Sequence, residues 1–123
     1  MLRRLTEHQL RQIKLGPEDL EQMRFVEWLE GKGYKYTSVP NATFTKSWKQ
    51  KARNDLLGLR SGFPDLIVIA NGKLCCPEMK KKKGGVTTPN QKAWIKALTE
   101  AGIPAKVCNG ADEAIAFVKE VCA

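Results

Sequence analysis

Residues 61–80 read SGFPDLIVIANGKLCCPEMK. Two apolar runs flank the pair Asn71-Gly72, and Asn-Gly between such runs is the strongest short-range signal for a β-hairpin. The first run, residues 66–70, is unbroken, which is typical of a strand covered on both faces. This stretch therefore predicts a hairpin inside a sheet that has helices packed on both sides.

The segments around the hairpin alternate between helical and strand patterns. We expect helices at residues 17–31, 46–60, 89–102 and 110–122, and strands at residues 34–40 and 103–108. The order of helix, strand, helix, hairpin, helix, strand and helix indicates the α/β class. Gly16 and Pro17 interrupt the pattern, so we expect an N-terminal helical arm of residues 1–16 and one domain of residues 17–123. In the second helix, Trp48 and the leucines are expected to dock on the core while the basic residues face outwards.

Charge and cysteine content restrict the function. The 123 residues include 21 Lys and Arg against 13 Asp and Glu, a net charge of +8, so nucleic acid is the leading partner. No apolar run is long enough for a bilayer and no signal segment is recognisable, so we expect a soluble, intracellular, cytoplasmic protein without a membrane partner. The four cysteines form no C-x-x-C pair, which argues against zinc and favours buried free thiols.

Three charged residues stand at the open end of the predicted hairpin. The register that the Asn71-Gly72 turn sets would oppose Asp65 to Glu78, and like charges opposed on neighbouring strands are destabilising. Lys80 lies on the same face as Glu78 and supplies one positive charge. A divalent cation bound by both carboxylates would supply the rest, and oxygen ligands favour Mg²⁺ or Mn²⁺. The alternative is a frayed hairpin whose charges form weak surface pairs.

These residues resemble the G-x-P-D…E-x-K signature of the PD-(D/E)xK nucleases, and their surroundings resemble the virus-type replication-repair nuclease (VRR-NUC) branch. The signature is carried by Gly62, Pro64, Asp65, Glu78 and Lys80, and the branch by VPN at 39–41, GLRSG at 58–62, TPNQKAWIKAL at 88–98 and AGIPAKVC at 101–108. The resemblance extends from residue 18 to the C-terminus. It implies a restriction-endonuclease-like core, in which a central mixed β-sheet is flanked by helices on both faces.

The resemblance also implies a metal-dependent endonuclease that hydrolyses phosphodiester bonds in DNA. In such an enzyme Asp65 and Glu78 bind Mg²⁺ or Mn²⁺, the main-chain carbonyl of Met79 adds a ligand, and Lys80 acts on the attacking water. Small stand-alone members of the family resemble homodimeric enzymes that cleave Holliday junctions. The resemblance therefore implies a homodimer that cuts branched DNA during DNA repair, encoded by a phage or prophage.

Two further side chains are candidates for the site. The family often has a metal-binding glutamate at the start of this helix, and Glu18, four residues before Gln22, matches its E-x-x-x-Q form better than Glu21 does. The alternative for Glu18 is a carboxylate that complements the helix N-terminus. The family uses a glutamine at the position of Gln91 in its active site, whereas the local pattern predicts a capping box between Thr88 and Gln91.

The residues expected to contact nucleic acid are mostly basic: Asn41, Lys51, Arg53, Arg60, Lys81, Lys82 and Lys83. Trp48 and Trp94 could stack on bases, but their helical spacing among leucines favours a place in the core. Pro77 departs from the family pattern and removes a ladder donor, so we expect an edge or irregular strand there. The alternative function is a non-catalytic basic nucleic-acid-binding module with a vestigial metal site.

Overall fold

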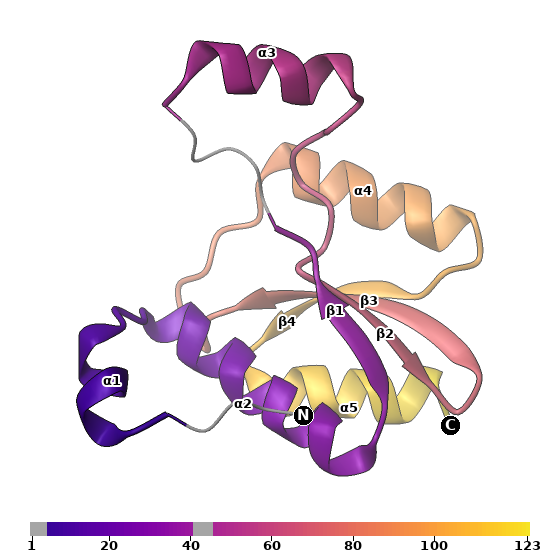
Figure 1. The fold of residues 1–123 in the computed structure, drawn as a ribbon. Coiled ribbons are helices and arrows are strands. Elements are labelled where there is room, and N and C mark those ends of the chain that lie inside the picture. The colour runs from indigo at the N-terminus through magenta and orange to yellow at the C-terminus, as the bar shows by residue number, and fades with distance from the viewer. Residues whose placement is uncertain (1–4, 41–45) are drawn as a thin grey trace.

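The computed structural model describes residues 5–40 and 46–123 (Figure 1). Its helices are α1 (Glu7–Gln12), α2 (Pro17–Lys32), α3 (Trp48–Leu56), α4 (Pro89–Glu100) and α5 (Ala111–Val121), and its strands are β1 (Lys35–Ser38), β2 (Leu66–Ala70), β3 (Lys73–Lys80) and β4 (Ala105–Asn109). The predicted α/β class is confirmed. The division into an arm and a domain at residue 16 stays a prediction. Within the described residues, no helix combines the length and apolar character needed to cross a membrane.

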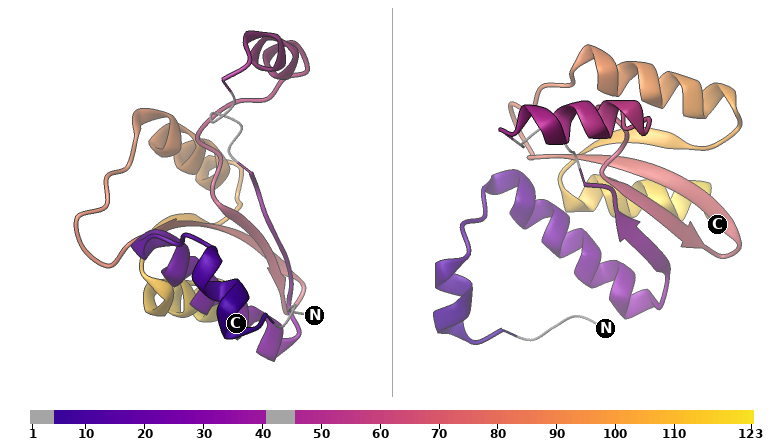
Figure 2. Two further views of the ribbon diagram at one scale, coloured as in Figure 1. Left: turned by 60° about the vertical axis from the view of Figure 1, so that its left-hand side comes forward. Right: turned by 45° about the horizontal axis from the view of Figure 1, so that its top comes forward.

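The four strands form one mixed sheet in the order β1-β2-β3-β4. β1 and β3 both run antiparallel to β2, whereas β3 and β4 are parallel. α2 and α5 cover one face of the sheet and α4 lies on the other (Figures 1 and 2). The expected mixed sheet with helices on both faces is therefore confirmed. The largest buried side chains lie between the sheet and the α2–α5 layer: Phe25, Leu29, Leu66, Val68, Met79, Phe117 and Val118.

The opposite face of the hairpin is only partly covered. Ile69 of β2 and Leu74 of β3 are cross-strand partners, and they are 45% and 38% exposed. α4 packs over β4 and does not extend to this end of the hairpin. The prediction that the run in residues 66–70 is covered on both faces is thus wrong at Ile69.

The hairpin turn sets the expected register, but only near the turn. Asn71 and Gly72 have φ values of 53° and 76°, and the pairs run from Ala70 with Lys73 to Val68 with Cys75. A turn with two positive φ values matches the right-handed twist of the flanking strands. The register is confirmed over these pairs.

Further along β3 the ladder to β2 ends. The predicted ladder pair of Asp65 with Glu78 is wrong, because the last pair of β2 with β3 is Val68 with Cys75 and Asp65 precedes β2. Pro77 has no N–H to donate, and the next N–H on that side, from Met79, donates to Asp65 Oδ2 at 2.7 Å. The irregularity expected at Pro77 is real. The alternative of an edge strand is wrong, because β3 lies between β2 and β4.

α3 stands apart from the sheet, beyond α4 (Figures 1 and 2). Trp48, Leu56 and Leu57 are 74%, 85% and 71% exposed, so the prediction that Trp48 and the leucines dock on the core is wrong. The segment between α3 and β2 packs instead on α4, because the Phe63 ring lies edge-on against the Trp94 ring with the centroids 5.1 Å apart. Trp94 is half-buried, in keeping with the place in the core expected for it.

The segment that returns from α3 to β2 passes close to α4, and two glycines test this contact. Gly62 (φ +96°) could not carry a Cβ without meeting the main chain of Asn90 at 2.7 Å, whereas Gly58 (φ +93°) has no atom within 4 Å of that position. We expect Gly58→Ala to lower the free energy of unfolding by roughly 1–2 kcal/mol through the left-handed backbone alone. Gly62→Ala should cost about 1–3 kcal/mol more because of the clash. Urea unfolding measures both, and equal losses would contradict the close contact.

Candidate active site

The predicted catalytic and metal-binding side chains come from the ends of four elements. Glu18 lies in the first turn of α2, Asp65 directly precedes β2, Glu78 and Lys80 end β3, and Gln91 lies in the first turn of α4. The fold brings these ends together at one edge of the sheet, where hydrogen bonds and an ion pair connect most of the five side chains.

Three carboxylates form the acidic part of the site. One oxygen from each of Glu18, Asp65 and Glu78 lies within 4.8 Å of the other two. Glu18 is exposed at the surface, yet partial desolvation raises its pKa, and repulsion from Asp65 acts in the same direction while Lys80 opposes both. Repulsion from Asp65 thus disfavours the ionised forms of Glu18 and Glu78, and a bound cation would relieve it.

Glu78 is the buried member of this group, with 1% of its surface exposed. Its Oε2 accepts a hydrogen bond from Gln91 Nε2 at 3.0 Å, whereas Oε1 is buried and has no hydrogen-bond partner among the residues that the structure describes. Burial raises the pKa of Glu78 to about 8, and repulsion from Asp65 adds to the effect. An unpartnered buried carboxylate oxygen beside two further carboxylates fits a hard divalent cation.

Lys80 and Gln91 form the polar wall of the site. Lys80 is 6% exposed, and its Nζ donates to Gln91 Oε1 at 3.1 Å and lies 3.6 Å from Glu78 Oε2. The capping box is confirmed, because Thr88 Oγ1 accepts from Gln91 N and Thr88 N donates to Gln91 Oε1. Gln91 thus caps the start of α4 while its amide contacts Lys80 and Glu78, and its role in an active site stays a prediction.

Glu21 is not part of the acidic cluster and instead contacts the start of α5. Its Oε1 accepts a hydrogen bond from Ala111 N, the first residue of α5, at 2.9 Å, and its Oε2 accepts one from Arg24. The hydrogen bond from Ala111 lowers the pKa of Glu21, and Arg24 acts in the same direction. Sequence reasoning missed this contact, because no local pattern relates a glutamate on α2 to a helix start ninety residues later.

The predicted nucleic-acid contacts fall into two groups. Lys81, Lys82 and Lys83 are exposed and line, with Pro17, Leu20 and Glu21, a groove of about 450 Å³ beside the start of α2. Lys51 and Arg53 lie on α3, and Arg60 follows it, paired with Asp55 at 3.1 Å. Asn41 lies outside the described residues.

Comparison with known proteins identifies the family. The fold and the acidic cluster are of the class implied by the PD-(D/E)xK resemblance. The VRR-NUC domain matches residues 4–112, and the chain belongs to the VRR-NUC family. A solved structure described as a VRR_NUC domain protein superposes with a TM-score of 0.70 at 26% sequence identity, over 89% of this chain and 90% of that one. No curated protein shows significant sequence similarity.

Membership of this family implies a nuclease with DNA as its substrate. The acidic cluster is consistent with a divalent metal ion in that activity.

The raised pKa of Glu78 predicts a pH-dependent stability. The folded protein binds the Glu78 proton more tightly than the unfolded chain does. The stability that this proton contributes is complete below the ordinary glutamate pKa of 4.5 and is lost as the pH rises to the folded-state pKa of about 8. In EDTA, Glu78→Gln should match the wild-type melting temperature near pH 4.5 and exceed it by roughly 5 °C or more at pH 8. Thermal unfolding followed by circular dichroism measures the difference. A constant offset between the two proteins at all pH values would contradict the raised pKa.

The two glutamates of α2 make a matched pair of variants. Glu21→Ala should lower the melting temperature by several degrees, because Ala111 N loses its acceptor, and should change Mn²⁺ binding little. Glu18→Ala should leave the melting temperature in EDTA unchanged or slightly raised and weaken Mn²⁺ binding about tenfold or more. Calorimetric titration with Mn²⁺ and thermal unfolding separate the two roles, and the reverse outcome would exchange the assignments.

Proposed function

We propose that this chain is an endonuclease that uses Mg²⁺ or Mn²⁺ to hydrolyse phosphodiester bonds in DNA. The observation that carries the proposal is the close approach of Glu18, Asp65 and Glu78 beside the buried Lys80. Burying a lysine and a glutamate at the end of a central strand opposes folding, so a function other than stability would explain the pair. Catalysis at a metal-dependent site is a function of this kind.

The roles of the side chains follow from their chemistry. Asp65, Glu78, Glu18 and the main-chain carbonyl of Met79 would hold the metal ion. When bound, such an ion lowers the pKa of a coordinated water and stabilises negative charge on a phosphate. Lys80 Nζ would orient the attacking water or accept its proton. Gln91 keeps Lys80 and Glu78 in place, since its amide contacts both.

The basic side chains would bind the DNA backbone. Lys81, Lys82 and Lys83 continue directly from the Lys80 strand, so a backbone lying along their groove would present a phosphate to the acidic cluster. Lys51, Arg53, Arg60 and Asn41 would extend this surface. Contacts of this kind add affinity that does not depend on sequence and weakens with salt.

Selectivity for branched DNA, including Holliday junctions, and action as a homodimer complete the proposal. A two-fold dimer presents two equivalent sites at once, and a four-way junction offers two equivalent strands. We also propose that the enzyme acts in the cytoplasm, because its four cysteines are buried free thiols, as expected in a reducing compartment.

Cleavage assays test the function. Labelled four-way junction, flap, duplex and single-stranded DNA are incubated with the protein in Mg²⁺, Mn²⁺ or EDTA. We expect metal-dependent cleavage of the branched substrates, reduced about 100-fold or more in Asp65→Asn and in Lys80→Ala. Lys119→Ala, an exposed lysine on α5, is the control and should retain activity. Light scattering of the same sample gives the oligomeric state.

Three outcomes are informative. Binding of all substrates by all variants without cleavage would favour the non-catalytic binding module. Cleavage at equal rates in wild type, Asp65→Asn and Lys80→Ala would contradict the site assignment. A monomeric mass with and without junction would contradict the dimer.

A further inference from the structure

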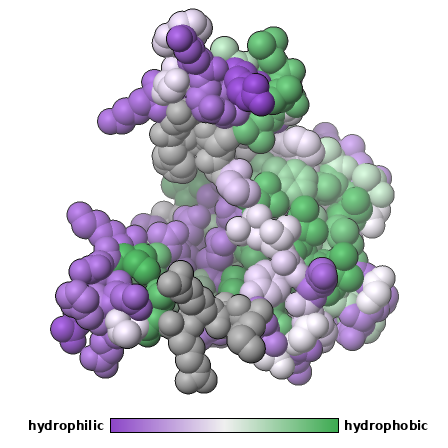
Figure 3. Space-filling view, viewed as in Figure 1, coloured by the Kyte–Doolittle hydropathy of each residue, from purple (hydrophilic) through white to green (hydrophobic). Residues whose placement is uncertain are grey.

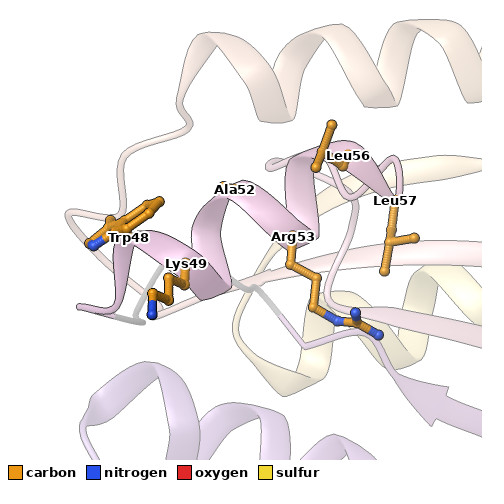
Figure 4. A pocket seen from close by; sticks show the side chains of 6 residues that line it. All are labelled: Trp48, Lys49, Ala52, Arg53, Leu56 and Leu57. Carbon is orange, nitrogen blue, oxygen red and sulfur yellow. The ribbon is translucent and has the colours of Figure 1, made fainter.

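α3 carries the most exposed apolar surface among the described residues. Its side chains Trp48, Lys49, Ala52, Arg53 and Leu56, together with Leu57 after its end, line a shallow groove of about 370 Å³ (Figure 4). Hydrophobic surface lies beside hydrophilic surface on this helix, at the top of Figure 3. A nine-residue helix that buries none of its side chains gains little stability from its own sequence. Exposed apolar side chains that lie together in this way make α3 a candidate interaction surface.

The charge of this segment indicates its partner. Residues 46–60 contain five basic residues and one acidic residue, Asp55, which pairs with Arg60. Lys49 Nζ lies 5.9 Å from the centre of the Trp48 ring, and Arg53 lines the same groove. Packing this face against the same face of a second copy would bring like charges together, whereas a polyanion would neutralise them.

Both ends of the α3 connection are fixed at the candidate active site. Where the chain leaves β1, Val39 N donates to the carbonyl of Asp65 at 2.7 Å. Where it returns, Ser61 accepts hydrogen bonds from Asn90 Nδ2 at 2.8 Å and from Trp94 Nε1 at 3.1 Å. α3 is therefore carried by a connection whose two ends lie beside residues of the candidate active site.

We propose that α3 binds DNA, with Trp48 stacking on an unpaired base while Lys49 and Arg53 contact the neighbouring phosphates. An intact duplex offers no free base face to an exposed indole, whereas a gap or branch point does. Stacking of a base on an aromatic side chain contributes about 1–3 kcal/mol, and phosphate contacts act on every DNA alike. α3 thus selects DNA that is opened near the cut. This inference rests on the proposed function for its substrate.

Binding in EDTA tests α3 without requiring cleavage. The anisotropy of a fluorescein-labelled duplex is compared with that of the same duplex carrying a short single-stranded gap. Trp48→Ala should weaken binding of the gapped DNA about tenfold and of the intact duplex less than about twofold. Trp48→Phe should retain most of the preference for the gap. Lys119→Ala, which removes an exposed side chain of α5 outside the groove, is the control and should change neither affinity.

Several results would overturn the inference. The first is that Trp48→Ala binds gapped DNA as tightly as the wild type does, and the second is that it loses equal affinity for gapped DNA and intact duplex. The third is that Trp48→Ala and Leu57→Ala bind DNA normally but have a lower mass in light scattering, which would make α3 a contact between copies. The proposed nuclease function fails separately: a gap preference that depends on Trp48 but no cleavage in Mg²⁺ or Mn²⁺ would sink that function and leave the role of α3 standing.

Discussion

The burial of Glu78 is the constraint on which the site depends. A carboxylate at the end of a central strand loses its water, and the protein replaces only part of what is lost: one hydrogen bond from Gln91 and a lysine 3.6 Å away. The second oxygen has no hydrogen-bond partner in the described part of the chain, and Asp65 and Glu18 add repulsion. Replacing a whole buried ion pair by well-packed apolar side chains is often neutral or stabilising. The carboxylate therefore opposes stability, and a proton or a cation at this point relieves the cost.

Contacts next to the carboxylates fix the relative positions of the elements that carry them. Glu21 joins α2 to the start of α5, and the N–H of Gly110 donates to the carbonyl of Lys80, so the end of β3 is tied to the same turn. On the other side, Gly62 and Ser61 lie against Asn90 at the start of α4. Repulsion among Glu18, Asp65 and Glu78 would otherwise separate these carboxylates, because Lys80 offsets only part of it. The rigidity of these neighbouring turns is what keeps the acidic oxygens within reach of one ion.

Local sequence patterns correctly predicted the turns and caps that depend only on neighbouring residues. The Asn71-Gly72 turn and the capping box at Thr88 and Gln91 follow from a few adjacent residues, and both are confirmed. The approach of Asp65 to Glu78 was predicted for the wrong reason. The two are not ladder partners, and the link runs through the N–H of Met79, which Pro77 leaves as the next donor towards β2. The contact of Glu21 with α5 and the exposure of α3 depend on how distant elements pack, and no local pattern encodes them.

The structure separates the groups suited to chemistry from the surface suited to substrate selection. Glu78 and Lys80 are buried at the end of β3, so a substitution there changes the packing of the core as well as the charge of the site. α3 buries no side chain, and exposed positions away from caps and turns contribute little to folding. Its sequence can therefore vary without unfolding the domain. Because the connection begins and ends beside Asp65, such variation would change which DNA reaches the carboxylates and leave the carboxylates themselves in place.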